Sequence, residues 1–296
     1  YLTLTIVLFG LYYVNGMSLF DAVAHSFTTI STGGFSTHDL SFAYFENHSI
    51  LLIAIIFMIL GSFPFLVLAK TNIKNPFAAF KDHQVKIFLL LLFISICLIY
   101  FFAQKYLIGS EIQKIIVISF NTISIISGTG FISENFEGWG NYASTLFLIL
   151  MFIGGCAGST TGGIKIFRFQ ILLKYIAIHL KKMLQPHAVI ASHFNGRKIQ
   201  DSTYESVMIF FFIYILTFAF SALLLSFSGL DFLTCFSAAA SAISNVGPGL
   251  GEIIGPEGNY GSLTSYTKIV LIFTMFLGRL EMLTILVLFL PSFWKN

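Results

Sequence analysis

Long runs of hydrophobic residues, separated by short polar segments, dominate the pattern along this chain. Three of these runs, 50–69, 87–103 and 206–230, contain no charged residue. A helix that crosses the roughly 30 Å hydrocarbon core of a bilayer needs about 20 predominantly apolar residues. The pattern therefore predicts a helix at 1–14, membrane helices at 50–69, 87–103, 205–228 and 268–290, and a hydrophobic stretch that is broken in its middle at 142–180.

Three shorter apolar runs lie between these predicted helices and are too short to span a bilayer. They are Leu19–Ile30, Glu111–Ile126 and Asp231–Ile243. Each run is followed by glycines. Asp21 and Asp231 lie near the starts of their runs, where a carboxylate stabilises a helix N-terminus. The pattern predicts short helices that enter the membrane and turn back at the glycines.

The residues at the three turning points form an internal repeat. They read TTISTGGF at 28–35, SIISGTGF at 124–131 and SAISNVGP at 241–248. One glycine cluster alone is explained by a tight turn in an outer loop, and its Ser and Thr residues by capping of a short helix. Three matching copies, each between two candidate helices, instead predict a repeated unit of helix, pore loop and helix.

Backbone geometry explains why such a unit would conduct cations. A short helix that stops within the membrane leaves its last carbonyl groups unpaired, so that end carries a partial negative charge. The residues that turn back outward can present carbonyl oxygens that replace the water around a dehydrated ion. Glycine permits the backbone conformations that this turn requires. Non-helical backbone persists at membrane depth only where it lines a water-filled path or is buried in protein.

The composition indicates a membrane protein. Of the 296 residues 56% are hydrophobic and 10% charged, whereas a soluble domain has about 25% charged residues; the mean hydropathy is +0.88.

The charge distribution predicts an orientation in the membrane. If polar segments alternate between the two sides, one side collects the basic residues Lys70, Lys74, Lys81, Lys86, Lys165, Arg168, Lys174, Lys181, Lys182, Arg197, Lys198 and Lys295, against the acids Asp82, Asp201 and Glu205. This excess marks the cytoplasmic side. We expect the loops 70–86 and 181–204 there, near anionic lipid headgroups, and the pore loops outside.

The glycine motifs resemble those of the Trk/Ktr/HKT superfamily of potassium transporters, and most closely those of the TrkH-type bacterial subunit. Members carry four non-identical helix–pore–helix repeats around a central pore, with one filter glycine per repeat. The resemblance implies an all-α integral membrane protein that holds three of the expected four repeats: 1–69 as the second, 87–180 as the third and 205–296 as the fourth. Because the chain opens inside a hydrophobic run at Tyr1, we expect the first repeat to lie upstream.

The resemblance places a selectivity filter in the three motifs. Its expected residues are Thr32, Gly33, Gly34, Phe35, Gly128, Thr129, Gly130, Phe131, Asn245, Val246, Gly247 and Pro248. The expected potassium ligands among them are Thr32, Gly33, Gly128, Thr129, Asn245 and Val246. The implied function is potassium uptake across the cell inner membrane, with potassium as substrate and no covalently bound cofactor. The resemblance also implies a homodimer and a cytosolic nucleotide-binding regulatory subunit; no nucleic-acid partner is expected.

A glycine-rich segment, GGCAGSTTGGIK at 154–165, interrupts the hydrophobic stretch 142–180. A phosphate-binding loop needs Lys where this segment has Ile164, and no intramembrane His is available to activate a serine, so no enzyme is expected. Such a segment is a weak helix former and cannot face lipid. The resemblance implies an intramembrane gate; the alternative is a kink that relieves packing. The gate glycines are Gly154, Gly155, Gly158, Gly162 and Gly163.

Arg279 lies midway along the predicted helix 268–290. A cation at that depth costs about 2.5–3.5 kcal/mol on insertion scales, so we expect it to face protein or water. The resemblance implies that Arg279 projects toward the pore below the filter and belongs to the gate. The alternative is a structural ion pair with a neighbouring repeat. His25, inside the first short helix, is expected to serve packing.

A secondary transporter of a small solute, built on discontinuous helices, is the alternative function. That architecture favours inverted repeats, whereas the charge pattern gives all three glycine motifs the same orientation.

Overall fold

The structure of the chain, a computed structural model, describes residues 1–45, 47–71, 78–185, 193–194, 197–280 and 282–295. Helices dominate it. The α-helices are α1 (Leu2–Val14), α2 (Leu19–Ile30), α3 (His48–Gly61), α4 (Phe65–Ala69), α5 (His83–Ala103), α6 (Glu111–Ile126), α7 (Asn141–Met151), α8 (Ile166–Leu184), α9 (Asp201–Ser226), α10 (Phe232–Ser244), α11 (Ser265–Arg279) and α12 (Met282–Leu288). The 3-10 helices are Ser41–Tyr44, Ala79–Lys81, Gln104–Tyr106, Phe136–Trp139, Tyr260–Ser262 and Pro291–Lys295. Two short strands, β1 (His193–Phe194) and β2 (Arg197–Lys198), pair antiparallel.

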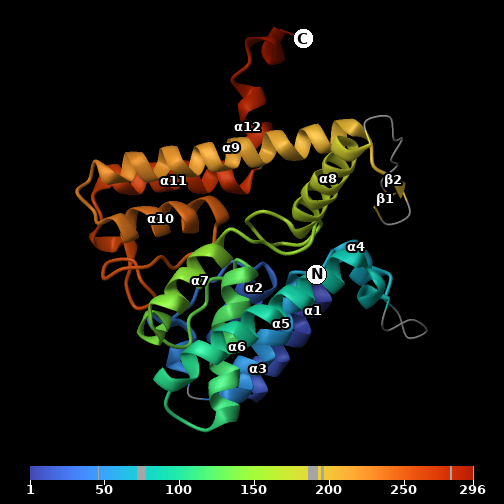
Figure 1. Ribbon diagram of the computed structural model, residues 1–296. Helices are drawn as coiled ribbons and strands as arrows, with labels where there is room; N and C mark the ends of the chain where they lie inside the picture. The colour runs from blue at the N-terminus through green and yellow to red at the C-terminus, as the bar shows by residue number, and fades with distance from the viewer. Residues whose placement is uncertain (46, 72–77, 186–192, 195–196, 281, 296) are drawn as a thin grey trace.

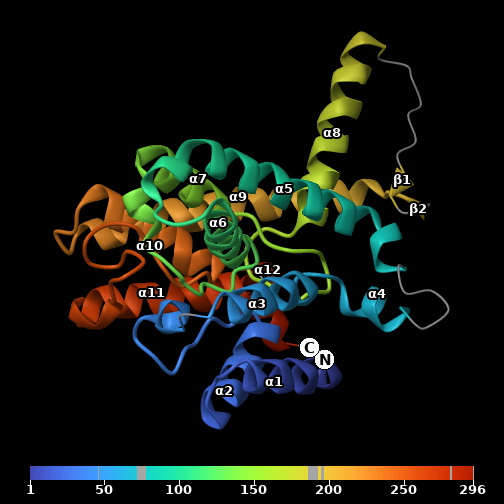
Figure 2. The same ribbon diagram turned by 90° about the horizontal axis from the view of Figure 1, so that it is seen from below.

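The helices form two groups (Figure 1). In one, α10 packs between α9 and α11. In the other, α6 packs against α3 and α5, and α1 packs against α2 and α3. The connection between α7 and α8 passes between the two groups, and α8 projects away from both (Figure 2).

Two helices in the described part of the chain are long and apolar enough to cross a membrane. They are α5 together with the 3-10 helix that follows it (His83–Tyr106, 24 residues) and α9 (Asp201–Ser226, 26 residues). They correspond to the predicted helices 87–103 and 205–228. Each begins earlier than predicted; at the first, the Asp82 carboxylate caps the helix by accepting from the amide of Gln84 at 2.8 Å.

The predicted continuous helix at 50–69 was wrong. Instead, α3 ends at Gly61 and α4 begins at Phe65. Pro64 causes the break, because proline has no amide hydrogen and disfavours helical backbone at the residue before it. The Phe65 amide, free of a helical partner, donates to the carbonyl oxygen of Gly158 at 3.0 Å. The break therefore joins this segment to the glycine-rich loop.

The predicted helix 268–290 is also divided, because α11 ends at Arg279 and α12 occupies Met282–Leu288. The two predicted cytoplasmic loops are described only in part. Lys74, in the first, lies outside the described residues, as do 186–192 and 195–196 of the second.

The short helices match their predicted positions. α2 and α6 have the predicted bounds, and α10 is shifted by one residue. Each begins at a side-chain cap: Ser18 accepts from the Asp21 amide at 3.1 Å, Asp231 accepts from the Thr234 amide at 3.2 Å, and Ser110 forms a capping box. Each ends at its glycine motif, which sets the position of the candidate site.

Candidate functional site

All three glycine motifs begin with the same backbone turn. An amide donates to the carbonyl oxygen five residues earlier, inside the short helix, at 2.8–3.0 Å. The pairs are Gly33 with Thr28, Thr129 with Ser124, and Val246 with Ser241. The residue before each donor has left-handed backbone, with φ of 51° at Thr32, 66° at Gly128 and 55° at Asn245. Three different sequences thus adopt one conformation at the positions that the repeat aligns.

The last glycine of each motif is also left-handed, with φ of 70° at Gly34, 79° at Gly130 and 119° at Gly247. Space adds a second requirement at two of them. A Cβ on Gly34 would lie 1.7 Å from the carbonyl oxygen of Thr129, and one on Gly130 would lie 1.9 Å from that of Val246. The first motif therefore packs on the second, and the second on the third. At Gly247 the nearest atom would be 3.9 Å away, so there the backbone conformation alone favours glycine.

The three motifs line one cavity of about 840 Å³. The predicted filter residues that line it are Thr32, Gly33, Gly34, Phe35, Thr129, Gly130, Asn245, Val246, Gly247 and Pro248. Two predicted residues lie behind this surface. Gly128 contacts the glycine-rich loop, and Phe131 is fully buried, with its ring centroid 4.4 Å from that of Phe42. Phe35, at the equivalent position of the first motif, is 77% exposed, so the aligned aromatic residues do not share one environment.

The glycine-rich loop between α7 and α8 touches the ends of all three short helices. The Thr160 hydroxyl donates to the carbonyl oxygen of Ile30, the last residue of α2, at 3.0 Å. A Cβ on Gly162 would lie 2.1 Å from the carbonyl oxygen of Ser244, the last residue of α10. One on Gly128, just beyond α6, would lie 3.5 Å from the Gly162 amide nitrogen. The loop is thus packed directly behind the three motifs.

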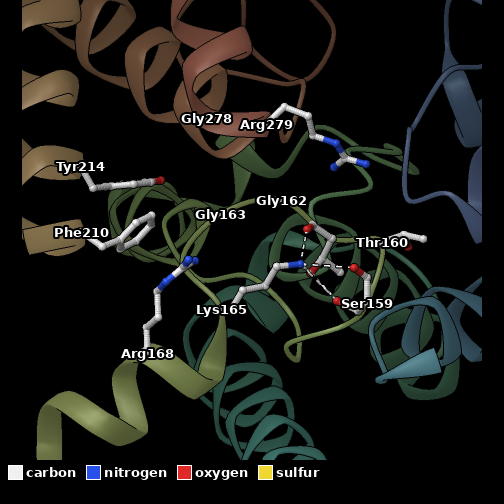
Figure 3. Close-up of a pocket in the computed structure, with 11 residues that line it drawn as sticks. Ser159, Thr160, Gly162, Gly163, Lys165, Arg168, Phe210, Tyr214, Gly278 and Arg279 are labelled. Carbon is white, nitrogen blue, oxygen red and sulfur yellow. Dashed lines mark hydrogen bonds between the residues drawn. The ribbon is translucent and has the colours of Figure 1, made fainter. Parts of the chain in front are cut away.

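The loop is closed by its own hydrogen bonds. The Gly154 amide donates to the carbonyl oxygen of Ile164 at 2.9 Å, which joins the two ends of the loop. The Lys165 ammonium donates to the carbonyl oxygen of Thr161 at 2.6 Å, and it lies 3.4 Å from both the carbonyl and the hydroxyl oxygen of Ser159 (Figure 3). One charged group therefore gathers several oxygens of the loop.

A second cavity, of about 230 Å³, lies on the other side of this loop. Figure 3 shows Arg279 reaching it from α11, opposite Lys165 and Arg168. The guanidinium carbon of Arg168 lies 3.8 Å from the ring centroid of Phe210, a cation–π contact. Arg279 lines both cavities. Its place follows from Gly278, where a Cβ would lie 1.9 Å from the carbonyl oxygen of Ile243, so α11 approaches the end of α10 closely.

Asp21 organises the N-terminal end of α2. Its carboxylate accepts from the hydroxyl groups of Thr37 at 2.5 Å and Ser18 at 2.7 Å. Partial burial by itself would raise the pKa of Asp21, but these hydrogen bonds and the nearby His38 outweigh it and hold the pKa below its usual value. The carboxylate ties the segment beyond the first glycine motif back to its helix.

The sequence did not predict the roles of three buried polar residues: His25, Asn121 and Ser237. His25 was expected to serve packing alone, yet its imidazole also hydrogen-bonds Ser36, beyond the first glycine motif. Asn121 and Ser237 do the same in the other two repeats. A polar residue inside each short apolar run, about nine positions before the last glycine, was the available signal.

Similarity to known proteins assigns the chain to a family. The sequence model of the family described as "TrkH: Cation transport protein" matches residues 1–296. "Trk system potassium uptake protein TrkI" of Halomonas elongata is 40% identical over 287 residues, which cover 96% of this chain and 58% of that protein. "Trk system potassium uptake protein TrkH" of Vibrio parahaemolyticus is 36% identical over 303 residues, covering 100% of this chain and 61% of that protein.

A solved structure agrees. The crystal structure of the potassium transporter TrkH from Vibrio parahaemolyticus superposes with a TM-score of 0.91 at 35% identity, covering 99% of this chain and 63% of that one. The chain thus spans about three-fifths of the length of the relatives that it matches. These relatives are named as transport proteins rather than enzymes. The chain belongs to the TrkH family of cation transport proteins.

Proposed function

We propose that this chain forms most of the ion path of a potassium uptake protein, with the three glycine motifs as its selectivity filter. The observation that carries the proposal is the convergence of three motifs with one backbone conformation on a single cavity. The names of the relatives, which are potassium uptake proteins, support potassium as the substrate.

In this proposal, backbone carbonyl oxygens of the motifs replace the hydration shell of the ion. The residues proposed to supply them are Thr32, Gly33, Thr129, Asn245 and Val246, which line the cavity, and Gly128, directly behind its surface. The C-terminal ends of α2, α6 and α10 meet at the same place, and their partial negative charges favour a cation there. Because the three motifs differ in sequence, they offer fewer equivalent carbonyl rings than a symmetric filter. We therefore expect looser discrimination between potassium and sodium.

The glycine-rich loop and Arg279 are the proposed gate. The loop contacts the ends of all three short helices, so any displacement of the loop changes the space directly behind the motifs. Arg279 lines the cavities on both sides of this region. A fixed positive charge there opposes the passage of a cation. Movement of the loop and a change in the position of Arg279 would together open the path.

The assembly and location of the protein belong to the same proposal. The protein lies in the cell inner membrane with its motifs facing outside and its basic loops in the cytoplasm, as the charge distribution favours. A fourth pore unit completes the filter, two copies associate, and a nucleotide-binding regulatory subunit docks from the cytosol. The alternative, a solute transporter with inverted repeats, is disfavoured because the charge pattern gives all three motifs the same orientation.

Replacement of Gly130 by Asp tests the filter assignment. A side chain at this position meets the carbonyl oxygen of Val246, and its carboxylate enters the cavity that the motifs line. We expect the Gly130→Asp variant of the complete protein to insert into membranes but to lose potassium-selective rubidium uptake in liposomes. The matched control is Gly138→Asp, because nothing lies within 4 Å of a Cβ at Gly138. Normal selective uptake by Gly130→Asp would refute the assignment.

A further inference from the structure

Among the fully buried polar side chains of the short helices, one in each helix bonds the chain beyond its motif from nearly the same distance before the last motif glycine. His25, Asn121 and Ser237 are all 0% exposed. Each of them hydrogen-bonds the chain just beyond the glycine motif, across 11, 12 and 13 residues respectively. The three bonds thus close three loops, and each loop contains one motif.

Asn121 holds its partner at two points. Its amide nitrogen donates to the Ser133 hydroxyl at 2.8 Å, and its amide oxygen accepts from the Ser133 backbone amide at 3.2 Å. The same nitrogen also donates to the carbonyl oxygen of Val117 at 3.0 Å. These three bonds fix the orientation of the Asn121 amide, because exchanging its oxygen and nitrogen would set donors against donors.

His25 achieves the same with different chemistry. Its Nδ1 lies 2.8 Å from the carbonyl oxygen of Asp21. A carbonyl only accepts, so Nδ1 carries the proton and, in the neutral ring, Nε2 accepts from the Ser36 hydroxyl at 2.9 Å. The ring of His25 is held edge-on against Phe42 and Phe45, with centroids 5.2 and 5.3 Å apart. Its orientation is therefore set by packing as well as by hydrogen bonds.

The single hydroxyl of Ser237 both accepts and donates a hydrogen bond. It accepts from the Leu250 backbone amide at 2.8 Å and donates to the Leu250 carbonyl oxygen at 3.1 Å. Leu250 is itself fully buried, so without Ser237 its backbone amide and its carbonyl oxygen would each lose one of these bonds in a buried position. An unsatisfied buried peptide group is costly, so the position of Leu250 is tied to that of α10.

The residues that these three side chains bond just beyond each motif, Ser36, Ser133 and Leu250, lie in no helix or strand. A buried polar side chain can find a hydrogen-bond partner within its own helix. The Ser26 hydroxyl does so by donating to the carbonyl oxygen of Val23 at 2.8 Å. His25, Asn121 and Ser237 also reach outside their helices. An imidazole, an amide and a hydroxyl meet the same geometric need in three dissimilar sequences.

We infer that His25, Asn121 and Ser237 are positioning residues that set ion discrimination, because each holds the chain beyond a glycine motif at a fixed distance from its short helix. This inference rests on the proposed filter. A filter replaces the hydration shell of an ion only if its carbonyl oxygens keep their spacing. Without these bonds the motifs would relax, and a smaller ion would be accepted more readily.

The test measures rubidium uptake into liposomes that contain the complete protein, with potassium and sodium as competitors. We expect His25→Leu and Asn121→Ala each to reduce the preference for potassium over sodium by about fivefold, the effect of losing part of a buried hydrogen bond. His25→Asn should restore the preference, since the amide of Asn121 does the same task at the 124–131 motif. Thr122→Val is the control, because the Thr122 hydroxyl has no hydrogen-bond partner in the described part of the chain.

The outcomes separate this inference from the proposed filter. Unchanged discrimination in His25→Leu and Asn121→Ala, beside a selective parent protein, would overturn the inference and leave the filter standing. A parent protein that does not discriminate would overturn the filter itself. If either variant fails to reach the membrane, Ser36→Ala and Ser133→Ala remove the hydroxyl groups that bond His25 and Asn121 from half-buried partners, and the same two results decide.

Discussion

At the scale of single residues, glycine is required in the motifs for two separable reasons. Gly34 and Gly130 have left-handed backbone and also leave no room for a Cβ against the next motif. The sequence predicted these positions because glycine recurs in an aligned pattern. It did not predict the bonds of His25, Asn121 and Ser237, because an imidazole, an amide and a hydroxyl form no repeat, and each partner is defined only once the chain has turned back.

Replacing Gly34 by Ala should therefore reduce selective transport by more than the strain of its left-handed backbone alone would cause. Left-handed backbone costs an L-residue about 1–2 kcal/mol, and the added Cβ would also meet the carbonyl oxygen of Thr129 at 1.7 Å. We expect Gly34→Ala to lower potassium-selective rubidium uptake by more than about tenfold, the equivalent of 1.4 kcal/mol. Gly10→Ala is the control, since nothing lies within 4 Å of that position in α1. Equal uptake by both variants would argue against close packing of the motifs.

At the scale of elements, local sequence signals predicted the ends of the short helices but not the breaks within the predicted helices 50–69 and 268–290. Caps and glycines bound α2, α6 and α10, so their predicted limits hold within one residue. The break at Pro64 was missed because the apolar run continues through it, although Phe65 then bonds the glycine-rich loop. That loop was predicted as a break in a helix. The hydrogen bonds of Lys165 that close it could not be predicted, because the hydrophobic pattern does not show which loop residues lie close together.

Loosening the loop is expected to speed transport without changing selectivity. The Lys165 ammonium binds oxygens of Ser159 and Thr161, so Lys165→Met removes the charge that gathers them and favours displacement of the loop. We expect a severalfold higher maximal rate of rubidium uptake and an unchanged preference for potassium over sodium. Lys174→Met is the control, because Lys174 lies on α8 and bonds the carbonyl oxygen of His193 instead. A slower or unchanged rate for Lys165→Met would contradict the role of the loop as a gate.

At the scale of the whole molecule, the motifs are ordered around the cavity as they are in the chain. The first packs on the second and the second on the third, whereas the third has no equally close neighbour on its next side among the described residues. Hydropathy and the repeat predicted the class of fold, and the family resemblance implied the convergence of the motifs. They could not predict which helix packs on which, because lipid-facing and protein-facing apolar residues look alike in sequence.

Competition for rubidium uptake by the complete protein tests the central claim most directly. Liposomes that contain it, with its cytosolic regulatory partner added, are loaded with tracer rubidium against increasing potassium or sodium. The account predicts that potassium inhibits uptake at clearly lower concentrations than sodium, because the three glycine motifs select by replacing the hydration shell of the ion. Equal inhibition by the two ions, or no rubidium uptake at all, would contradict it.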